Sequence, residues 1–142
     1  MTKRTVLLVE DNPQDELLIL RALRKVNVQA TIDVVRDGQQ AVDYLLRTGE
    51  FSDRPEGLPA LVLLDINLPK LSGLDVLKRV RTEPHTQLLP IVMFTSSDED
   101  RDRLRSYSSG ANSFVSKPVE FAKFMASAGQ VGTYWLGTNI PP

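Results

Sequence analysis

The sequence predicts one α/β domain in which a mostly parallel, five-stranded sheet lies between two layers of helices. Short apolar runs alternate with amphipathic stretches along the 142 residues. Some of these runs are uninterrupted, as expected for strands buried on both faces. With 42% hydrophobic and 25% charged residues, the composition is that of one ordinary globular domain. We expect no second folded domain.

The predicted strands are rich in β-branched and aromatic residues. They cover residues 5–9, 31–35, 60–64, 90–94 and 112–116. The first, third and fourth are almost entirely apolar and are expected at the centre of the sheet. The second strand contains a charge and the fifth alternates polar with apolar residues, so both are expected at edges.

The predicted helices cover residues 13–26, 38–47, 73–82, 99–109 and 119–136. Asn12 precedes Pro13 and is suited to cap the first helix. Other junctions carry turn pairs, namely Asp37-Gly38, Ser72-Gly73 and Ser109-Gly110. The stretch 48–59 contains Gly, Pro and Ser without periodicity, which predicts a long surface loop.

Charge and composition exclude several function classes. The net charge of -1 offers no basic excess for a nucleic-acid backbone or an anionic membrane. The absence of cysteine excludes disulfides and thiolate chemistry. The apolar run near the N-terminus is too short for a signal peptide, and no stretch approaches the roughly 20 apolar residues of a membrane span. We expect a cytoplasmic protein with neither nucleic-acid nor membrane partners.

Polar residues follow four of the predicted strands. They are Glu10 and Asp11, then Asp65, then Thr95 with Ser96 and Ser97, and finally Lys117 before Pro118. Parallel sheets place ligand sites beyond the carboxyl ends of their strands. If the strand order is 2-1-3-4-5, Glu10, Asp11 and Asp65 face one another. Such carboxylates repel unless a cation lies among them, and oxygen ligands suit Mg²⁺, with Mn²⁺ as the alternative.

These residue types can take roles in phosphoryl transfer. Asp65 is a candidate nucleophile toward phosphorus, because aspartyl phosphate is a known type of covalent intermediate. Thr95 and Lys117 can stabilise charge on the phosphoryl oxygens. No residue of the set is an obvious general acid or base.

The ordered set Glu10-Asp11, Asp65, Thr95 and Lys117-Pro118 resembles the receiver domain of two-component response regulators. The resemblance implies a flavodoxin-like, doubly wound, three-layer fold with strand order 2-1-3-4-5. It implies a receiver domain over residues 1–128, with 129–142 as an extension of the last helix and a tail. It further implies that Asp65 accepts a phosphoryl group from a phosphohistidine of a sensor histidine kinase, so that the protein is a signalling phosphoacceptor rather than an enzyme.

The resemblance also implies roles for individual residues. Mg²⁺ would be held by Asp11, Asp65 and the backbone carbonyl of Asn67, with Glu10 acting largely through water. Thr95 and Phe114 would form the switch pair. The bond from Lys117 to Pro118 would be a cis peptide that aims the lysine at the site. The sequence has Glu10 where Asp is commoner and Phe114 where Tyr is frequent.

Two features indicate a subgroup. The loop 48–59 and the tail "TYWLGTNIPP" look similar to small response regulators paired with phytochrome-type histidine kinases. A sensor kinase, such as a bacteriophytochrome, is therefore the expected partner. Few residues follow Pro118, so output is expected through the protein's own surface or through a phosphoryl relay.

The first predicted helix has one apolar stripe and two further leucines. The stripe consists of Leu18, Ile19, Ala22, Leu23 and Val26. Leu17 and Leu20 fall outside it, beside Arg21 and Arg24. They are either singly exposed leucines, which are common, or part of a docking surface for the kinase. The candidate docking residues are Gln14, Asp15, Leu17, Leu18 and Arg21.

The last predicted helix extends past the usual end of a receiver domain. Its apolar residues at helical spacing are Phe121, Phe124, Ala128, Val131 and Trp135. Trp135 either folds back onto its own domain or contributes to a homodimer through the fourth helix, fifth strand and fifth helix. The candidate dimer residues are Phe124, Tyr134 and Trp135. His85 lies in a polar connection and is expected at the surface rather than as a phosphate carrier.

Two other function classes remain open from the residues. Aspartate-based phosphohydrolases share a strand-end Asp, but their second Asp, two residues on, serves as general acid. Asn67 occupies that position here, and the acidic pair precedes Asp65 instead of following it. The other class is a receiver-like module that binds partners without being phosphorylated.

Overall fold

The computed structural model describes residues 4–26 and 29–142. Its five strands are β1 (Thr5–Val9), β2 (Thr31–Val35), β3 (Leu61–Leu64), β4 (Ile91–Thr95) and β5 (Ser113–Ser116). They form one parallel sheet in the order β2-β1-β3-β4-β5, which confirms the predicted order. The limits agree with the predicted strands to within one residue.

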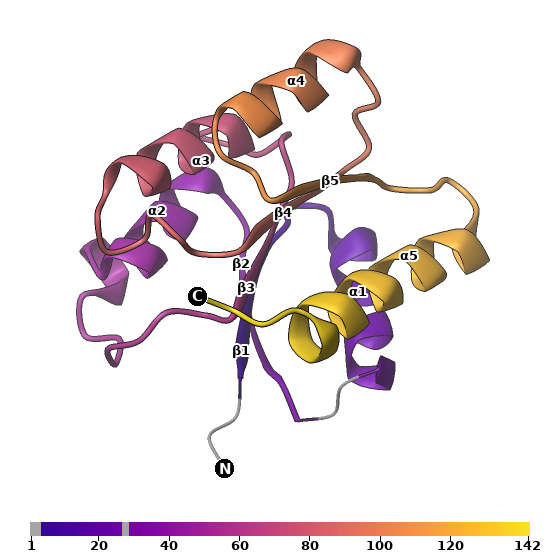
Figure 1. Cartoon of the computed structure of the whole chain (residues 1–142), viewed down its shortest axis with the longest axis horizontal. Helices are drawn as coiled ribbons and strands as arrows, with labels where there is room; N and C mark the ends of the chain where they lie inside the picture. Colours follow the sequence, from indigo (N-terminus) through magenta and orange to yellow (C-terminus); the bar gives the residue numbers. More distant parts are fainter. Residues whose placement is uncertain (1–3, 27–28) are drawn as a thin grey trace.

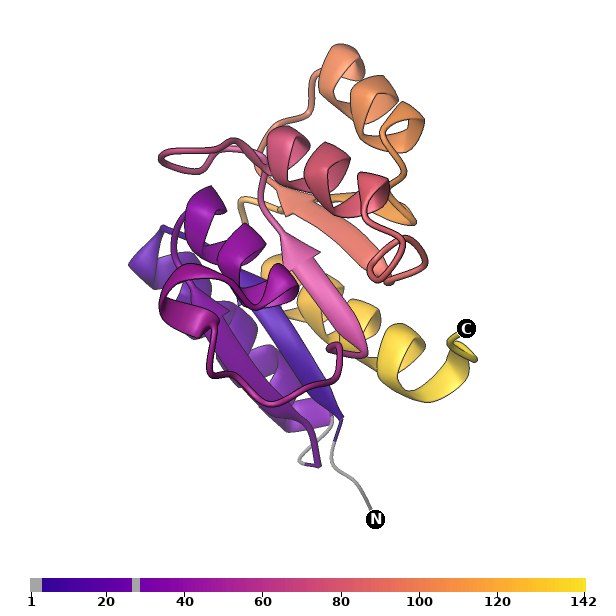
Figure 2. The ribbon, with the colours of Figure 1, turned by 90° about the vertical axis from the view of Figure 1, so that its left-hand side faces the viewer.

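Helices cover both faces of this sheet. They are α1 (Pro13–Val26), α2 (Gly38–Leu46), α3 (Gly73–Thr82), α4 (Asp100–Ser108) and α5 (Phe121–Thr133). Figure 1 shows α1 and α5 side by side on one face, with α2 and α3 on the other and α4 beyond α3 near β5. The turned view in Figure 2 shows the strands running between these two helical layers. None of the helices in the described part of the chain is both long enough and apolar enough to cross a bilayer.

The side chains of β1 show why its sequence is apolar throughout. Leu7 and Val9 pack into the cluster under α2 and α3, whereas Val6 and Leu8 pack into the cluster under α1 and α5. Since successive side chains point to opposite faces, a strand covered on both faces needs an apolar residue at every position. Strands β3 and β4 are buried in the same way, and β2 and β5 are the partly exposed edges, as predicted.

The predicted cap at Asn12 is formed, and the structure adds caps at Asp37 and Ser72, which the sequence indicated only as turn residues. Asn12 Oδ1 accepts from the backbone N–H groups of Gln14 at 3.0 Å and Asp15 at 3.1 Å. Asp37 caps α2 and Ser72 caps α3 in the same way. These side chains satisfy N–H groups that have no partner within the helix, which fixes where each helix begins.

The apolar stripe predicted for α1 needs one correction. Val26 is 43% exposed, although it was expected in the core, and Leu20 packs partly against the core, although it was placed outside the stripe. Val26 faces Gly129 and Gly132 of α5, which have no side chain to cover it. A groove of about 650 Å³ remains between the two helices there.

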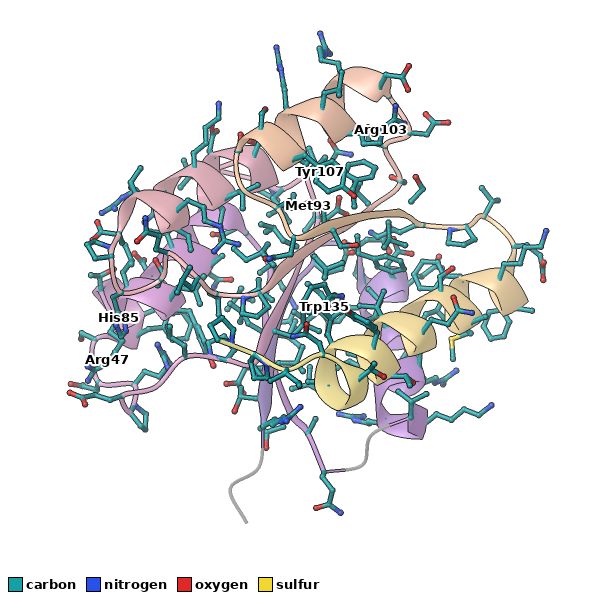
Figure 3. All side chains as sticks on the ribbon, viewed as in Figure 1. Arg47, His85, Met93, Arg103, Tyr107 and Trp135 are labelled. Atoms are coloured by element: carbon teal, nitrogen blue, oxygen red, sulfur yellow. The ribbon has the colours of Figure 1, made fainter. Side chains whose placement is uncertain are left out.

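The last predicted helix is shorter than expected. Helix α5 ends at Thr133, and the chain continues as a π turn over Tyr134–Thr138. Trp135 in that turn (Figure 3) is half-buried and packs against the core of its own domain. Arg4 donates to the carbonyl of Leu136, a buried residue of the same turn. The segment after α5 is therefore attached to its own domain.

Phe124 is a second correction in α5. Its side chain is 5% exposed and its ring lies 5.4 Å from that of Phe94, edge to face. It belongs to the core under α1 and α5, so it offers no surface to a second protein. Tyr134 remains 49% exposed.

The loop 48–59 is held against α2 by Arg54. The guanidinium carbon lies 4.3 Å from the ring centre of Tyr44, and Nε donates to the Tyr44 carbonyl at 2.8 Å. Nη1 donates to the Gly57 carbonyl at 2.9 Å. The Tyr44 hydroxyl in turn donates to Asp33 Oδ2 at 2.6 Å. A 3₁₀ turn over Gly49–Phe51 is the only regular structure that the loop contains, all of it within the described residues.

His85, in the connection before β4, is exposed as predicted (Figure 3).

Candidate functional site

The carboxyl ends of the strands bring the predicted polar residues to one edge of the sheet. Each residue continues the backbone ladder just past its strand: the N–H of Glu10 donates to Val35 O at 3.1 Å and that of Asp65 to Val9 O at 3.3 Å. The N–H of Lys117 donates to Thr95 O at 2.7 Å. These bonds fix the backbone, so the side chains emerge at defined positions on this edge.

Lys117 lies at the centre of the site. Its Nζ donates to Glu10 Oε1 at 2.5 Å and to Asp65 Oδ2 at 2.7 Å. It also donates to Asp15 Oδ2 at 2.9 Å. The predicted site residues Glu10, Asp65 and Lys117 are thus brought together. Asp15 was predicted as a docking residue, and the sequence analysis missed its contact with this lysine; its place five residues after Glu10, in the first turn of the next helix, was the available signal.

Burial and the neighbouring charges shift the pKa values of Lys117 and Glu10. The side chains of Lys117, Glu10 and Asp65 are 4%, 1% and 6% exposed. Burial alone would lower the pKa of Lys117, but Asp65 and Glu10 outweigh it and raise this pKa above its usual value. Burial raises the pKa of Glu10 to about 7, against the opposing effect of Lys117. The single positive charge of Lys117 is too small to neutralise the three carboxylates bonded to it.

The oxygen-bearing side chains at this edge are of the types that bind a divalent cation, but the carboxylates are not grouped as the sequence predicted. Asp11 and Asn67 are exposed beside the site. In the residues described, no three His, Asp or Glu side chains are arranged to surround one metal ion. Among the described residues, Glu10, Asp11 and Asp65 do not form such a group, and Lys117 donates to both Glu10 and Asp65. The donors are all oxygens and carry excess negative charge, which suits Mg²⁺ or Mn²⁺.

Thr95 and Phe114 lie on the two strands next to this cluster. Thr95 is buried, and its hydroxyl oxygen accepts from the N–H of Ser97 at 3.3 Å. The Ser97 hydroxyl donates to Asp102 Oδ2 of α4 at 2.6 Å. Phe114 is half-buried, and its N–H donates to the hydroxyl of Tyr107, also from α4, at 3.2 Å (Figure 3). Both members of the predicted pair are therefore connected to α4.

The bond between Lys117 and Pro118 is trans, as are all peptide bonds among the described residues. The expected cis peptide is therefore a wrong prediction for this structure. The lysine reaches Asp65 with the trans bond, because the N–H of Lys117 extends the ladder to Thr95 and aims the side chain along the same edge.

The loop after Asp65 packs tightly against its surroundings. A Cβ atom on Gly73 would lie 2.0 Å from the carbonyl oxygen of Asp65, and one on Gly38 would lie 2.0 Å from that of Leu71. The sequence marked both glycines only as turn residues. Their structural role is to let α3 and α2 approach the backbone of the loop that carries Asp65.

The remaining docking candidates lie on α1. Gln14, Leu17 and Arg21 are exposed, whereas Leu18 is half-buried against the core. The three exposed candidates, Gln14, Leu17 and Arg21, therefore lie on the same helix as Asp15, which contacts Lys117.

Comparison with known proteins gives a consistent match. The family model described as "Response regulator receiver domain" matches residues 6–128. "Probable methanogenesis regulatory protein FilR2" of Methanothrix harundinacea is 39% identical over 137 residues, covering 96% of this chain and 86% of its own length. "Response regulator Rcp1" of Synechocystis sp. is 30% identical over 139 residues, covering 98% of this chain and 93% of its own.

Solved structures match over nearly the whole chain. The phosphorylated cyanobacterial phytochrome response regulator RcpA superposes with a TM-score of 0.93 at 32% identity, covering 99% of both chains. The Mn²⁺-bound form of Rcp1 gives 0.92 at 30% identity, covering 98% of this chain and 99% of its own. The bacteriophytochrome response regulator AtBRR gives 0.78 at 47% identity, covering 100% and 98%.

Proposed function

Because the chain belongs to the response regulator receiver family, we propose that it accepts a phosphoryl group on Asp65 from a sensor histidine kinase. The observation that carries this proposal is the buried carboxylate of Asp65 with Lys117 Nζ at 2.7 Å, at the edge of the sheet where the strands end. The bond from Lys117 fixes this carboxylate in place, as a nucleophile must be.

The transfer follows from the groups at this edge. An oxygen of Asp65 forms the new bond to phosphorus as the bond from phosphorus to the kinase histidine nitrogen breaks, and the nitrogen keeps the electron pair. Lys117 stabilises negative charge on the phosphoryl oxygens, and the Thr95 hydroxyl can donate to one of them. No general acid is required of this chain when the other ring nitrogen of the phosphohistidine carries a proton, because the imidazole then leaves in its neutral form.

We infer that the divalent cation is Mg²⁺, with Mn²⁺ as a substitute. Asp11, Asp65 and the carbonyl of Asn67 would hold it, and Glu10 would act through water. The cation neutralises charge on the phosphoryl oxygens when it is bound. The excess of negative charge around Lys117 supports this assignment, and so does the Mn²⁺-bound structure of the similar protein Rcp1.

Output would start at Thr95. When its hydroxyl turns to the phosphoryl group, its bond with the Ser97 N–H is lost, and Ser97 is bonded to α4 through Asp102. Phe114 and Pro118 would complete the switch at β5 and the loop that follows it. The result is a changed surface over α4, β5 and α5, or a phosphoryl group passed onward in a relay.

The similarities to RcpA, Rcp1 and AtBRR support a phytochrome-type kinase as the partner, with light as its signal. Gln14, Leu17 and Arg21 would contact the helical bundle of this kinase, together with Leu18 where it is exposed. We further propose a homodimer to which Tyr134 contributes, with Trp135 at its margin. A cytoplasmic location fits a partner whose phosphohistidine must be reached directly.

The deciding experiment is incubation with acetyl phosphate and Mg²⁺, followed by intact mass measurement. We expect the mass of one phosphoryl group to be added to the wild-type protein and to Asp53→Asn, a control in the surface loop. The Asp65→Asn variant should gain nothing. A folded wild-type protein that gains no phosphoryl group with metal present would overturn the proposal and favour a binding module that is not phosphorylated.

A further inference from the structure

Helix α1 supplies a carboxylate that the proposed chemistry leaves unused. A lysine ammonium has three N–H groups and no acceptor. In this structure, Glu10, Asp65 and Asp15 accept one bond each, at 2.5, 2.7 and 2.9 Å. Every N–H of Lys117 therefore has a carboxylate partner before any phosphoryl group arrives. While Asp65 is still a carboxylate, before transfer, a phosphoryl oxygen of the donor can bind Lys117 only if one of these acceptors is released.

Burial decides which acceptor is released. The side chains of Glu10 and Asp65 are 1% and 6% exposed, so either would become a buried carboxylate without its cation. The side chain of Asp15 is 26% exposed. Water can replace its bond with Lys117, and Asp15 also makes the longest of the three contacts. Asp15 is the acceptor whose release costs least.

The position of Asp15 is built into the start of α1. Asn12 Oδ1 accepts from the N–H groups of Gln14 and Asp15, which orients the first turn of the helix. A carboxylate in the first turn is also stabilised by the helix dipole. The next residue, Glu16, binds Arg36 at 2.9 and 3.0 Å instead of Lys117. The same turn thus contains one carboxylate in the site and one outside it.

We propose that Asp15 is a positioning residue that holds Lys117 in the unphosphorylated protein and yields it to the phosphoryl group. This inference rests on the proposed phosphoacceptor role of Asp65. It places Asp15 in the site, on the same helix turn as the exposed Gln14, so that contacts made on this turn act on the lysine. Asp15 competes with the phosphoryl donor for one N–H of Lys117.

The first test observes the lysine without metal or phosphoryl donor. The Lys117 ammonium should give a proton–nitrogen correlation signal at low temperature, assigned by its loss in Lys117→Arg, because all its protons are held by acceptors. Asp15→Ala should broaden or remove this signal, and Asp15→Glu should restore it in part. Glu16→Ala is the matched control, since it removes a carboxylate from the same turn, and it should leave the signal unchanged.

The second test measures phosphorylation by acetyl phosphate at fixed Mg²⁺. Asp15→Ala should lower the half-saturating concentration of acetyl phosphate by about threefold or more, with the maximal rate within about twofold of wild type, because a competing acceptor is removed. Glu16→Ala should behave as wild type. If Asp15→Ala does not fold, Asp15→Asn removes the charge at constant size and should shift both readouts in the same direction.

Two results would overturn the proposal. One is a Lys117 signal that Asp15→Ala and Asp15→Asn leave unchanged. The other is an equal shift of half-saturation in Asp15→Ala and Glu16→Ala, which would indicate a general effect of charge. Failure of the wild-type protein itself to be phosphorylated would count against the role of Asp65, while the metal-free signal would still decide whether Asp15 holds the lysine.

Discussion

Lys117 Nζ lies 2.7 Å from Asp65 Oδ2, although the two residues follow strands β5 and β3, which are separated in the sheet by β4. The lysine side chain therefore passes the end of β4, where Thr95 lies. Both partners are buried. Removing Lys117 leaves Glu10 and Asp65 as buried carboxylates without a cation, a change that commonly destabilises a protein by about 3–5 kcal/mol, whereas removing Asp65 leaves the lysine paired with Glu10 and Asp15. This geometry makes the site sensitive to charge, pH and metal.

Glu10 should make the stability of the metal-free protein depend on pH. Burial raises its pKa from 4.5 to about 7 in the folded protein. The folded state thus binds this proton more tightly than the unfolded chain does, so its contribution to stability is full below pH 4.5 and is lost as the pH rises through about 7. Urea denaturation across this range should show the free energy of unfolding falling, and Glu10→Gln should flatten the slope. Equal slopes in the two proteins would contradict the assignment.

Mg²⁺ should stabilise the folded protein without any phosphoryl donor. A ligand that binds only the folded state adds about 2.7 kcal/mol at 100 times its Kd. We therefore expect the Tm to rise with Mg²⁺ concentration in the wild-type protein and in the loop variant Asp53→Asn. Asp11→Asn should need much more Mg²⁺ for the same rise. A Tm that Ca²⁺, Mg²⁺ and Mn²⁺ all leave unchanged would remove the metal site.

Gly73→Ala should destabilise the fold and slow phosphorylation. Its Cβ would lie 2.0 Å from the carbonyl oxygen of Asp65, so the loop or α3 must move, at a typical overpacking cost of about 1–3 kcal/mol. Gly129→Ala in α5 is the matched control. There the nearest atom, on Val26, would be 3.4 Å away, and alanine should stabilise the helix by about 0.5–1 kcal/mol. Urea denaturation of both variants tests the pair; a neutral Gly73→Ala would show that the close contact is absent.

Arg54→Ala should release the loop 48–59 from α2. The substitution removes the stacking on Tyr44 and the bonds to the Tyr44 and Gly57 carbonyls. Hydrogen exchange in this loop should become faster, while exchange in β1 stays slow. Arg54→Lys should not restore protection, because lysine lacks the planar fork that reaches several carbonyls at once. Full protection in Arg54→Lys would show that charge alone holds the loop.

Substitutions at Tyr134 and Phe124 should distinguish an effect on dimer formation from an effect on folding stability. Phe124→Ala should cost about 3–5 kcal/mol of stability, because it opens a cavity beside Phe94. Tyr134→Ala should leave stability nearly unchanged and weaken the proposed dimer, as seen by sedimentation velocity with and without phosphorylation. A wild-type protein that stays monomeric at high concentration in both states would reject the dimer.

Much of the fold follows from local patterns in the sequence. The alternation of apolar runs and amphipathic stretches predicted the five strands to within one residue. Burial on two faces requires an apolar side chain at every position of the three central strands, which made these the clearest. The cap at Asn12 was also predicted, since it satisfies N–H groups a few residues away, whereas Asp37 and Ser72 were marked only as turn residues. The strand order depended on the family resemblance rather than on periodicity.

Contacts between distant segments were the part that the sequence could not supply. The exposure of Val26 depends on glycines more than 100 residues later in α5, and the burial of Phe124 depends on Phe94. The hydrophobic periodicity of α1 does not reveal the first of these contacts, and that of α5 does not reveal the second. The expected cis bond before Pro118 was also wrong, since the peptide bond is trans.

The order of residues along the chain is enough to put a carboxylate at the end of a buried strand, with a hydroxyl and a lysine at the ends of later strands. Which carboxylates the lysine binds depends on the packing of the folded chain. This packing selected Asp15 and left Asp11 exposed, because the capped first turn of α1 brings Asp15 to the end of β5. The physical reason is that residue type and spacing encode local conformation, whereas the partner of a buried charge depends on how separate elements pack.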